Sequence, residues 1–236
     1  MDSVTMVGVG PCTPSAFLEG NDRSNTSFGT DLQSNLKNYM DWLDEKPNEL
    51  VIYIAFGSYA EIPNQLMKEI AQGLLKNGRP FLWVIRKGKK GGKSEENLRC
   101  KEELEKQGKI VTWCSQVEVL HHPSLGCFLT HCGWNSTLES LVSGMPIVAC
   151  PLWNDQLCNA KLIQDVLKIG VRVSVNDEGI VEKDDLGRCI DVVMKGEEYR
   201  KNAKKWKDLA KEAMKENGSS NMNLQAYVKE ILLGHS

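Results

Sequence analysis

Six short apolar runs alternate along this chain with segments of helical periodicity. The runs lie at 50–56, 81–85, 109–112, 126–130, 147–150 and 171–175. Short continuous apolar runs are typical of strands that are buried on both faces, and strands that alternate with helices favour a parallel sheet covered on either side. We therefore expect an α/β fold with a Rossmann-like parallel sheet and helices on both faces.

The segments between and after the runs predict the helices. They lie at 35–43, 62–76, a short stretch ending near 106, 115–121, 134–143, a stretch following 151–156 and ending near 167, 182–195, 197–216 and 221–233. Residues 1–34 are rich in Gly, Pro, Ser, Asn and Thr and lack periodicity, so we interpret them as a linker or coil. Residues 35–236 are then predicted to form one domain.

Charge and cysteine content narrow the class of protein. The net charge of −2, with both signs interspersed, gives no reason to expect nucleic acid or a membrane as a partner. No apolar run has the length of a signal or membrane-spanning segment. The eight cysteines form no Cys-x-x-Cys and no zinc-finger spacing, which favours reduced structural thiols and a cytoplasmic location.

Three clusters of polar and aromatic residues each follow a predicted strand. They are Trp113 to Gln116, His131 to Glu139, and Trp153 to Gln156. Right-handed crossovers place the carboxyl ends of parallel strands on one edge of a sheet, where such folds bind ligands. We therefore predict that the three clusters line one groove, and that its ligand is a nucleotide sugar.

The second cluster has the pattern of a strand, a tight turn and a helix N-terminus. Unpaired N–H groups and the helix dipole favour an anion there, and Gly133 would let a phosphate approach the backbone. Asn135 and Ser136 would add donors, although both could equally be ordinary helix caps. His131 offers an imidazole N–H, and Glu139, one turn beyond Ser136, would accept from a sugar diol unless it is simply a solvated glutamate.

The first and third clusters suit the two ends of the same ligand. Trp113, expected on the strand next to the second cluster, would stack on a base, with a core tryptophan as the alternative. Gln116 would reach a ribose hydroxyl. Asp155 and Gln156 suit the vicinal hydroxyls of a hexose, whereas Asn154 or Asp155 could instead cap a helix.

The sequence also contains partial matches to other nucleotide-binding motifs, but none of these motifs is complete. The segment GKKGGKS at 88–94 lacks the first glycine of a P-loop, and Gly8-x-Gly10 lacks the third glycine of a dinucleotide fingerprint. No Asp-x-Asp is present to hold a metal on a diphosphate, which disfavours a metal-dependent sugar transferase. The pair His121-His122 is interpreted as a partner of a helix C-terminus.

Residues 113–156 closely resemble the signature box of the plant family 1 UDP-glycosyltransferases. They contain its Trp-x-x-Gln, His-Cys-Gly-Trp-Asn-Ser-x-x-Glu and terminal Asp-Gln. Phe56-Gly57-Ser58 and Gly218-Ser219-Ser220 also resemble the family, and 9–17 resembles its interdomain linker. The branch most similar acts on anthocyanins, crocetin-like and other carboxylic or phenolic acceptors.

This resemblance implies the C-terminal, donor-binding domain of a GT-B fold. The UDP-binding residues it implies are Ser58, Trp113, Cys114, Ser115, Gln116, His131, Gly133, Trp134, Asn135, Ser136 and Glu139. The sugar-binding residues it implies are Trp153, Asn154, Asp155 and Gln156, with glucose favoured by the terminal glutamine. The implied donor is UDP-glucose, without cofactor or metal.

The resemblance also sets an expectation about catalysis. In the family, an N-terminal domain binds the small-molecule acceptor and supplies a catalytic histidine that an aspartate orients. This sequence begins at the linker, and its histidines are 121, 122, 131 and 235. We therefore expect no catalytic residue here, and UDP-glucose binding without transfer by the chain alone. The whole enzyme would perform inverting transfer to a hydroxyl or carboxyl of a plant metabolite. The alternative is a stand-alone nucleotide-sugar-binding module.

Overall fold

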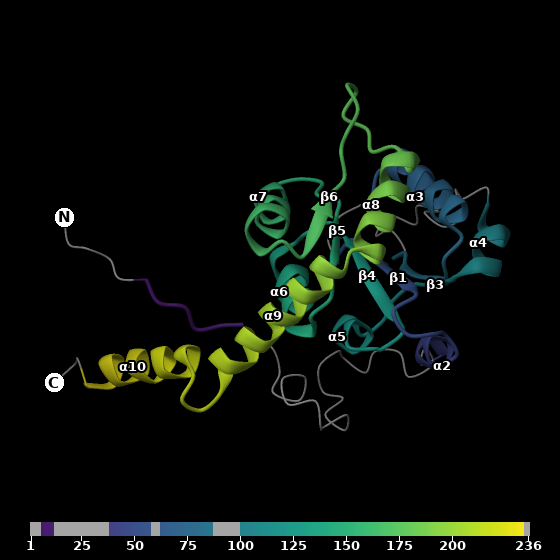
Figure 1. Ribbon diagram of the computed structural model, residues 1–236. Helices are drawn as coiled ribbons and strands as arrows, with labels where there is room; N and C mark the ends of the chain where they lie inside the picture. Colours follow the sequence, from purple (N-terminus) through teal and green to yellow (C-terminus); the bar gives the residue numbers. More distant parts are fainter. Residues whose placement is uncertain (1–5, 12–37, 58–61, 87–99, 234–236) are drawn as a thin grey trace.

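A computed structural model describes residues 6–11, 38–57, 62–86 and 100–233 (Figure 1). Most of the expected linker, the GKKGGKS segment and Ser58 lie outside these ranges. Seven cysteines lie within them, and all seven are free thiols. None of the helices in this part of the chain is long and apolar enough to cross a membrane.

Six parallel strands form a single sheet in the order β3-β2-β1-β4-β5-β6. The strands are β1 (Val51–Ala55), β2 (Phe81–Val84), β3 (Lys109–Val111), β4 (Leu125–Thr130), β5 (Ile147–Ala149) and β6 (Gly170–Arg172). The strand order reverses between β1 and β4, and a crevice opens at such a point beyond the carboxyl ends of the strands. The predicted Rossmann-like sheet is confirmed.

Two details of the predicted sheet are wrong. Trp113 follows β3, which is the edge strand and is separated from β4 by β2 and β1, so the first cluster does not lie on a neighbouring strand. The last strand is shorter than 171–175 because β5, its partner in the described part of the chain, has three residues and pairs with Gly170, Val171 and Arg172.

The helices begin and end close to the predicted positions. They are α2 (Asn38–Asp44), α3 (Asn64–Asn77), α4 (Lys101–Gln107), α5 (Gln116–Leu120), α6 (Trp134–Ser143), α7 (Gln156–Lys161), α8 (Lys183–Lys195), α9 (Glu197–Met214) and α10 (Ser219–Leu233). The stretch that was expected to run as one helix to 167 instead changes after α7 into the π-helix η1 (Leu162–Leu167). Within η1, Ile163 and Leu167 lie in the core, and the helix ends at Lys168 in a left-handed conformation.

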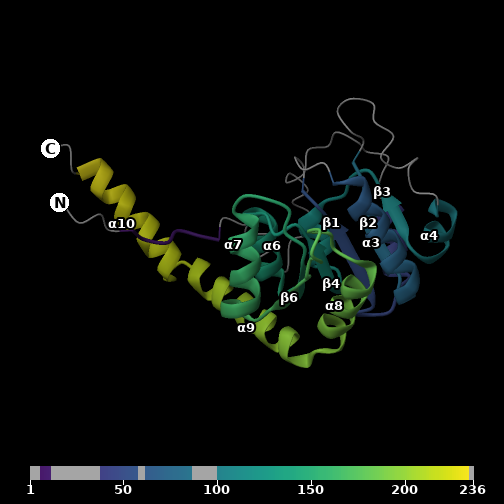
Figure 2. The same cartoon turned by 90° about the horizontal axis from the view of Figure 1, so that it is seen from above.

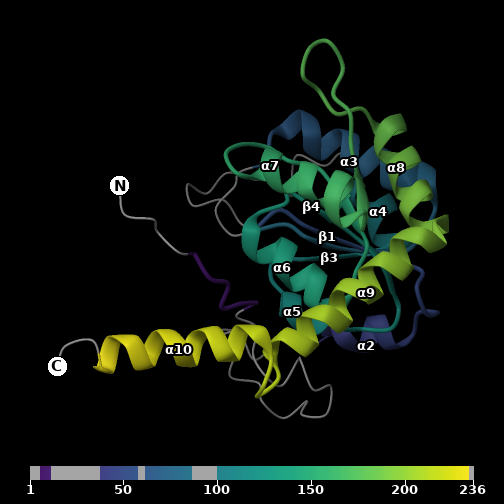
Figure 3. The same ribbon diagram turned by 60° about the vertical axis from the view of Figure 1, so that its left-hand side comes forward.

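The sheet is covered on both faces because its side chains alternate in direction. On β1, Ile52 and Ile54 pack with the buried residues of α3 and α8, while Tyr53 packs with those of α2 and α5. Figures 1 and 3 show α3 and α8 on one side of the strands and α2 and α5 on the other. A further apolar cluster packs α7, η1 and α9 against β5.

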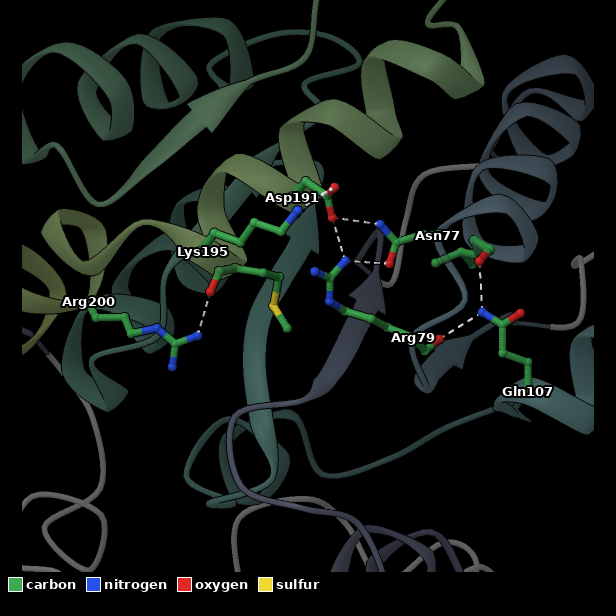
Figure 4. A network of polar contacts seen from close by, with 8 residues as sticks. Asn77, Arg79, Gln107, Asp191, Lys195 and Arg200 are labelled. Atoms are coloured by element: carbon green, nitrogen blue, oxygen red, sulfur yellow. Dashed lines mark hydrogen bonds and ion pairs between the residues drawn. The ribbon is translucent and has the colours of Figure 1, made fainter.

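A polar network fixes the amino-terminal edge of the sheet (Figure 4). The Arg79 guanidinium, just before β2, donates to the Asp191 carboxylate of α8 at 2.5 Å and to the Asn77 carbonyl oxygen at 2.9 Å. The bond from Arg79 helps to hold the pKa of Asp191 below the usual value. Gln107 donates to the carbonyls of Leu74 and Arg79, both at 2.7 Å. The loops that carry the three clusters lie at the opposite edge of the sheet, where the strands end.

The helix α10 extends away from the sheet at the end of α9, and residues 6–11 run beside it (Figures 1 and 2). Ser220 Oγ donates to the Gly10 carbonyl at 2.5 Å, and Asn223 Nδ2 donates to the Gly8 carbonyl at 2.8 Å. Residues more than 200 positions apart in the sequence are therefore joined directly.

Candidate functional site

The loop after β4 turns sharply into α6. Cys132 has a φ of 63°, which reverses the chain before Gly133 begins the helix. Among the described residues, no side chain caps α6, so the N–H groups of its first turn have no capping side chain there. The capping alternative for Asn135 and Ser136 is therefore not what the structure shows. Asn135 is exposed, as is Trp134, and the Ser136 hydroxyl is engaged by Gln116.

The His131 imidazole lies between two glycines at the switch point of the sheet. A β-carbon on Gly57 would lie 2.7 Å from His131 Nε2, and one on Gly133 would lie 2.6 Å from it. Burial lowers the pKa of His131, an effect that the nearby Asp155 charge partly opposes. Near neutral pH the ring is therefore uncharged and carries one N–H that it can donate.

Gln116 joins the first and second clusters. Its Nε2 donates to Ser136 Oγ at 3.0 Å and to Glu139 Oε2 at 2.5 Å. Burial raises the pKa of Glu139, while the bond from Gln116 acts in the opposite direction. Glu139 is thus a partly buried acceptor fixed by an amide, and the alternative of a solvated glutamate is wrong.

The loop after β3 reaches this region although β3 is at the edge of the sheet. The Ser115 N–H donates to the Tyr39 hydroxyl of α2 at 3.1 Å. Cys114 is buried with its Sγ 3.2 Å from the Tyr53 hydroxyl, and burial raises the pKa of its thiol to about 12. Trp113 is only partly buried, so it is not a core tryptophan and the residue retains accessible surface.

The third cluster forms an exposed loop whose backbone is hydrogen-bonded by the side chain of Gln156. Gln156 is 6% exposed, and its Oε1 accepts from the N–H groups of Leu152 at 2.9 Å and Trp153 at 3.1 Å. Trp153 itself is 47% exposed, and Asn154 adopts a φ of 55°. Asp155 is at the N-cap position of α7 but makes no side-chain cap, so the capping alternative is not observed here either.

Asn159 joins the second and third clusters, and the sequence interpretation missed it. Its Nδ2 donates to the Cys132 carbonyl at 2.9 Å and to Asp155 Oδ2 at 2.8 Å. The side chain is buried on α7, one helical turn after Asp155. The available signal was a polar residue four positions after Asp155, next to Ala160, which packs in the core with Ile163.

The other described histidines have structural partners. His121 Nδ1 lies 2.8 Å from the Val117 carbonyl, as expected for a residue at a helix C-terminus. His122 differs from that prediction, because its ring bonds Ser124 Oγ at 2.8 Å and Asp44 Oδ1 at 3.0 Å. Within the described ranges, no group of three His, Cys, Asp or Glu side chains is placed to hold a metal ion.

The sheet order, and the loops that converge on its carboxyl edge, define a Rossmann-like α/β domain. The chain belongs to the UDP-glycosyltransferase family. The family model described as "UDP-glucoronosyl and UDP-glucosyl transferase" matches residues 27–216. Its homologues are plant enzymes of this family, and the family predicted from the signature box is confirmed.

Relatives and solved structures agree on this assignment. The chain is 57% identical to crocetin glucosyltransferase of Gardenia jasminoides and 57% identical to phloretin 4'-O-glucosyltransferase of Malus domestica, each match covering 51% of the relative and 100% or 98% of this chain. The crystal structure of Os79 from O. sativa in complex with UDP superposes with a TM-score of 0.86 at 40% identity, covering 95% of this chain and 50% of Os79. The chain thus spans about half the length of the relatives it matches.

Proposed function

We propose that this chain is the donor-binding part of a UDP-glucose-dependent glucosyltransferase. The uracil stacks on Trp113 beside Cys114 and Ser115, the ribose bonds Gln116 and Glu139, and the diphosphate meets the N-terminus of α6. The residues that hold the diphosphate are His131, Gly133, Trp134, Asn135, Ser136 and Ser58. Trp153, Asn154, Asp155 and Gln156 hold the glucose.

The observation that carries this proposal is the bonding between the three clusters. Gln116 links the first cluster to the second, and Asn159 links the second to the third. The N–H groups at the start of α6 are donors, and the carboxylates of Glu139 and Asp155 are acceptors on either side. This arrangement suits a diphosphate between the hydroxyls of a ribose and those of a hexose. Complexes of Os79 with UDP and of a Phytolacca americana UGT2 with UDP-2fluoro-glucose and pterostilbene support a nucleotide-sugar ligand.

In the whole enzyme, we propose an inverting transfer that uses no metal or cofactor. A base removes the acceptor's proton, and the acceptor oxygen attacks the anomeric carbon from the face opposite the phosphate. The bond from that carbon to the β-phosphate oxygen breaks, and UDP departs with the electron pair. N–H groups at the start of α6 and the neutral His131 ring stabilise the developing charge.

The base and the acceptor site belong, in this proposal, to a part of the whole protein other than these residues. His121 and His122 are engaged in structural bonds, and His131 serves the diphosphate. Relatives named for crocetin, phloretin and anthocyanidin support a hydroxyl or carboxyl of a small plant metabolite as the acceptor. Free thiols support a reducing compartment, and we propose the cytoplasm.

Titration calorimetry tests the donor proposal. UDP and UDP-glucose are expected to bind in EDTA, UDP-galactose less well, and ADP-glucose much less well because the base site is built for uracil. Failure of both uridine ligands to bind would overturn the proposal, and a strict requirement for a divalent ion would overturn its metal-independent form.

A stand-alone nucleotide-sugar-binding module is the second candidate. The chain would be mixed with a separately produced acceptor-binding half of a relative, UDP-glucose and a phenolic acceptor. Formation of a glucoside that depends on both halves supports the transferase. Tight UDP-glucose binding with no product in any combination would favour the module.

A further inference from the structure

Tyr53 is hydrogen-bonded to Gln116 and was not among the predicted site residues. It belongs to β1, where every other side chain is aliphatic, and it is 1% exposed. Its ring stacks on Phe128 of β4, with centroids 4.7 Å apart and an interplanar angle of 22°. The stacking fixes the position of the ring, and its hydroxyl contacts Cys114 of the loop after β3.

The Tyr53 hydroxyl has two partners above it. It donates to Gln116 Oε1 at 3.3 Å, and Cys114 Sγ lies 3.2 Å away. A hydroxyl carries a single hydrogen, so when Tyr53 donates to the Gln116 carbonyl, its contact with Cys114 needs the thiol as the donor. The Cys114 thiol stays protonated because burial raises its pKa to about 12, so it can donate its own hydrogen to the Tyr53 oxygen.

Gln116 accepts a hydrogen bond at one end of its side chain and donates at the other. Its carbonyl accepts from Tyr53, and its amino group donates to Ser136 and to Glu139 Oε2. The two ends of a carboxamide are similar in shape but opposite in hydrogen bonding. A hydroxyl that donates to the carbonyl and a carboxylate that only accepts from the amino group therefore favour the same orientation of Gln116. The bonds of Gln116 therefore run in one direction, from the Tyr53 hydroxyl through the carboxamide to the Glu139 carboxylate.

We propose that Tyr53 is a positioning residue for ribose recognition. By bonding the Gln116 carbonyl, it keeps the amino group against Glu139 Oε2, so that the other carboxylate oxygen, Oε1, is the acceptor for a ribose hydroxyl. Tyr53 does not touch the nucleotide itself. This inference rests on the proposed UDP site, and it adds to that proposal a buried residue from the central strand.

The test measures discrimination rather than affinity alone. The ratio of the Kd of 2′,3′-dideoxy-UDP to that of UDP is determined for the unsubstituted protein and for Tyr53→Phe, which keeps the ring and its stacking on Phe128. Losing one buried hydrogen bond is expected to lower this ratio by roughly three- to tenfold. In a Gln116→Ala background, Tyr53→Phe should lower it no further, because residues of one network are not additive.

Tyr39→Phe is the matched control. It also removes a buried tyrosine hydroxyl beside the same loop, but that hydroxyl accepts from the Ser115 backbone and does not contact the Gln116 side chain. The ratio should be unchanged in Tyr39→Phe. An equal fall in both variants would show general loosening of the loop and would overturn the role of Tyr53.

The outcomes separate this proposal from the donor site itself. If the unsubstituted protein does not bind UDP, the proposed function fails. If it binds UDP and rejects the dideoxy ligand, but Tyr53→Phe has the same ratio, only the inference about Tyr53 fails. NMR of the unsubstituted protein provides a test that does not depend on any variant folding. A Tyr53 hydroxyl proton in slow exchange, with an Overhauser contact to Gln116, supports the proposal, and a freely exchanging one contradicts it.

Discussion

The His131 imidazole occupies the space that a side chain on Gly133 would take. A β-carbon there would lie 2.6 Å from His131 Nε2, closer than non-bonded atoms approach one another. Gly133 has an ordinary negative φ of −58°, so this position requires glycine for space and not for backbone freedom. The glycine of this turn therefore serves the histidine as well as any phosphate that approaches the helix.

Gly133→Ala is expected to displace the imidazole and to weaken UDP binding by roughly tenfold, about 1.4 kcal/mol. Calorimetry provides the measurement. Gly187→Ala is the control, because a β-carbon on this glycine of α8 meets nothing within 4 Å. It should leave the Kd unchanged and stabilise the fold by about 0.4–1 kcal/mol. Equal UDP affinity in both variants would contradict the role assigned to His131.

Trp113→Ala is expected to weaken UDP binding by about 1–3 kcal/mol through loss of base stacking, without unfolding the protein, since the ring is only partly buried. Inorganic pyrophosphate lacks a base and serves as the control ligand. Its affinity should be the same before and after the substitution. Unchanged UDP affinity would count against stacking on this ring.

In the proposed site Gln156 has two separable roles, and two substitutions distinguish them. Its Oε1 holds the backbone of Leu152 and Trp153, which leaves its amino group to donate to a sugar. Gln156→Glu keeps the acceptor and removes the donor, so UDP-glucose binding should weaken more than UDP binding, and the buried carboxylate should also lower the free energy of unfolding. Gln156→Ala removes both, and the free energy of unfolding should also fall, by about 1–3 kcal/mol. Equal losses for the two ligands in Gln156→Glu would mean that this side chain does not touch the sugar.

Asn159→Leu removes both bonds that join the second and third clusters, and it leaves the Cys132 carbonyl without that donor. We expect the free energy of unfolding to fall by roughly 2–4 kcal/mol and UDP-glucose binding to weaken. Asn202→Leu is the control, since Asn202 donates one bond to the Lys168 carbonyl far from the site. Asn202→Leu should change the free energy of unfolding by no more than about 0.5 kcal/mol and leave the ligand affinity unchanged. Denaturant unfolding and calorimetry measure the two effects.

Glu139 gives the site a pH dependence whose sign follows from its burial. Its pKa in the folded protein is raised above the usual 4.5, so it takes up a proton as the pH falls through that raised value. Protonation removes an acceptor for the ribose, and UDP affinity should fall. The free energy of unfolding has the opposite trend: ionised Glu139 destabilises the fold at neutral pH, and this cost disappears as the pH falls from the raised pKa towards 4.5.

Glu139→Gln isolates this effect, because UDP's own phosphate titration is common to both proteins. The variant should bind UDP more weakly at pH 7 and show a shallower loss of affinity on acidification. Identical pH profiles for the two proteins would show that the Glu139 carboxylate does not contribute to binding.

The sequence was sufficient to predict the layers of this fold, because apolar runs and helical periodicity depend on neighbouring residues. It could not place β3 at the edge, since strand order depends on which strands pair in space. The position of Trp113 relative to the second cluster was misjudged for that reason. The π-helical turns after α7 also have no local signature in 162–167.

The polar site residues stand out in the sequence because they interrupt apolar patterns at strand ends. Asn159 and Tyr53 were missed because each lies inside a regular element, where a single polar group suggests a satisfied core residue. Their importance depends on contacts across 27 and 63 positions of sequence. Such contacts become visible only in three dimensions.

Two non-glycine residues in the candidate site have left-handed backbone conformations, Cys132 at φ 63° and Asn154 at φ 55°. Such conformations are costly for residues with a β-carbon and persist only where the surroundings impose them. Cys132 is fully buried, whereas Asn154 is exposed. Selection for thermal robustness would therefore favour glycine at 154 first, where the side chain is exposed. Retention of asparagine there by laboratory evolution under combined selection for heat resistance and glucosylation would indicate that the side chain is kept for the ligand.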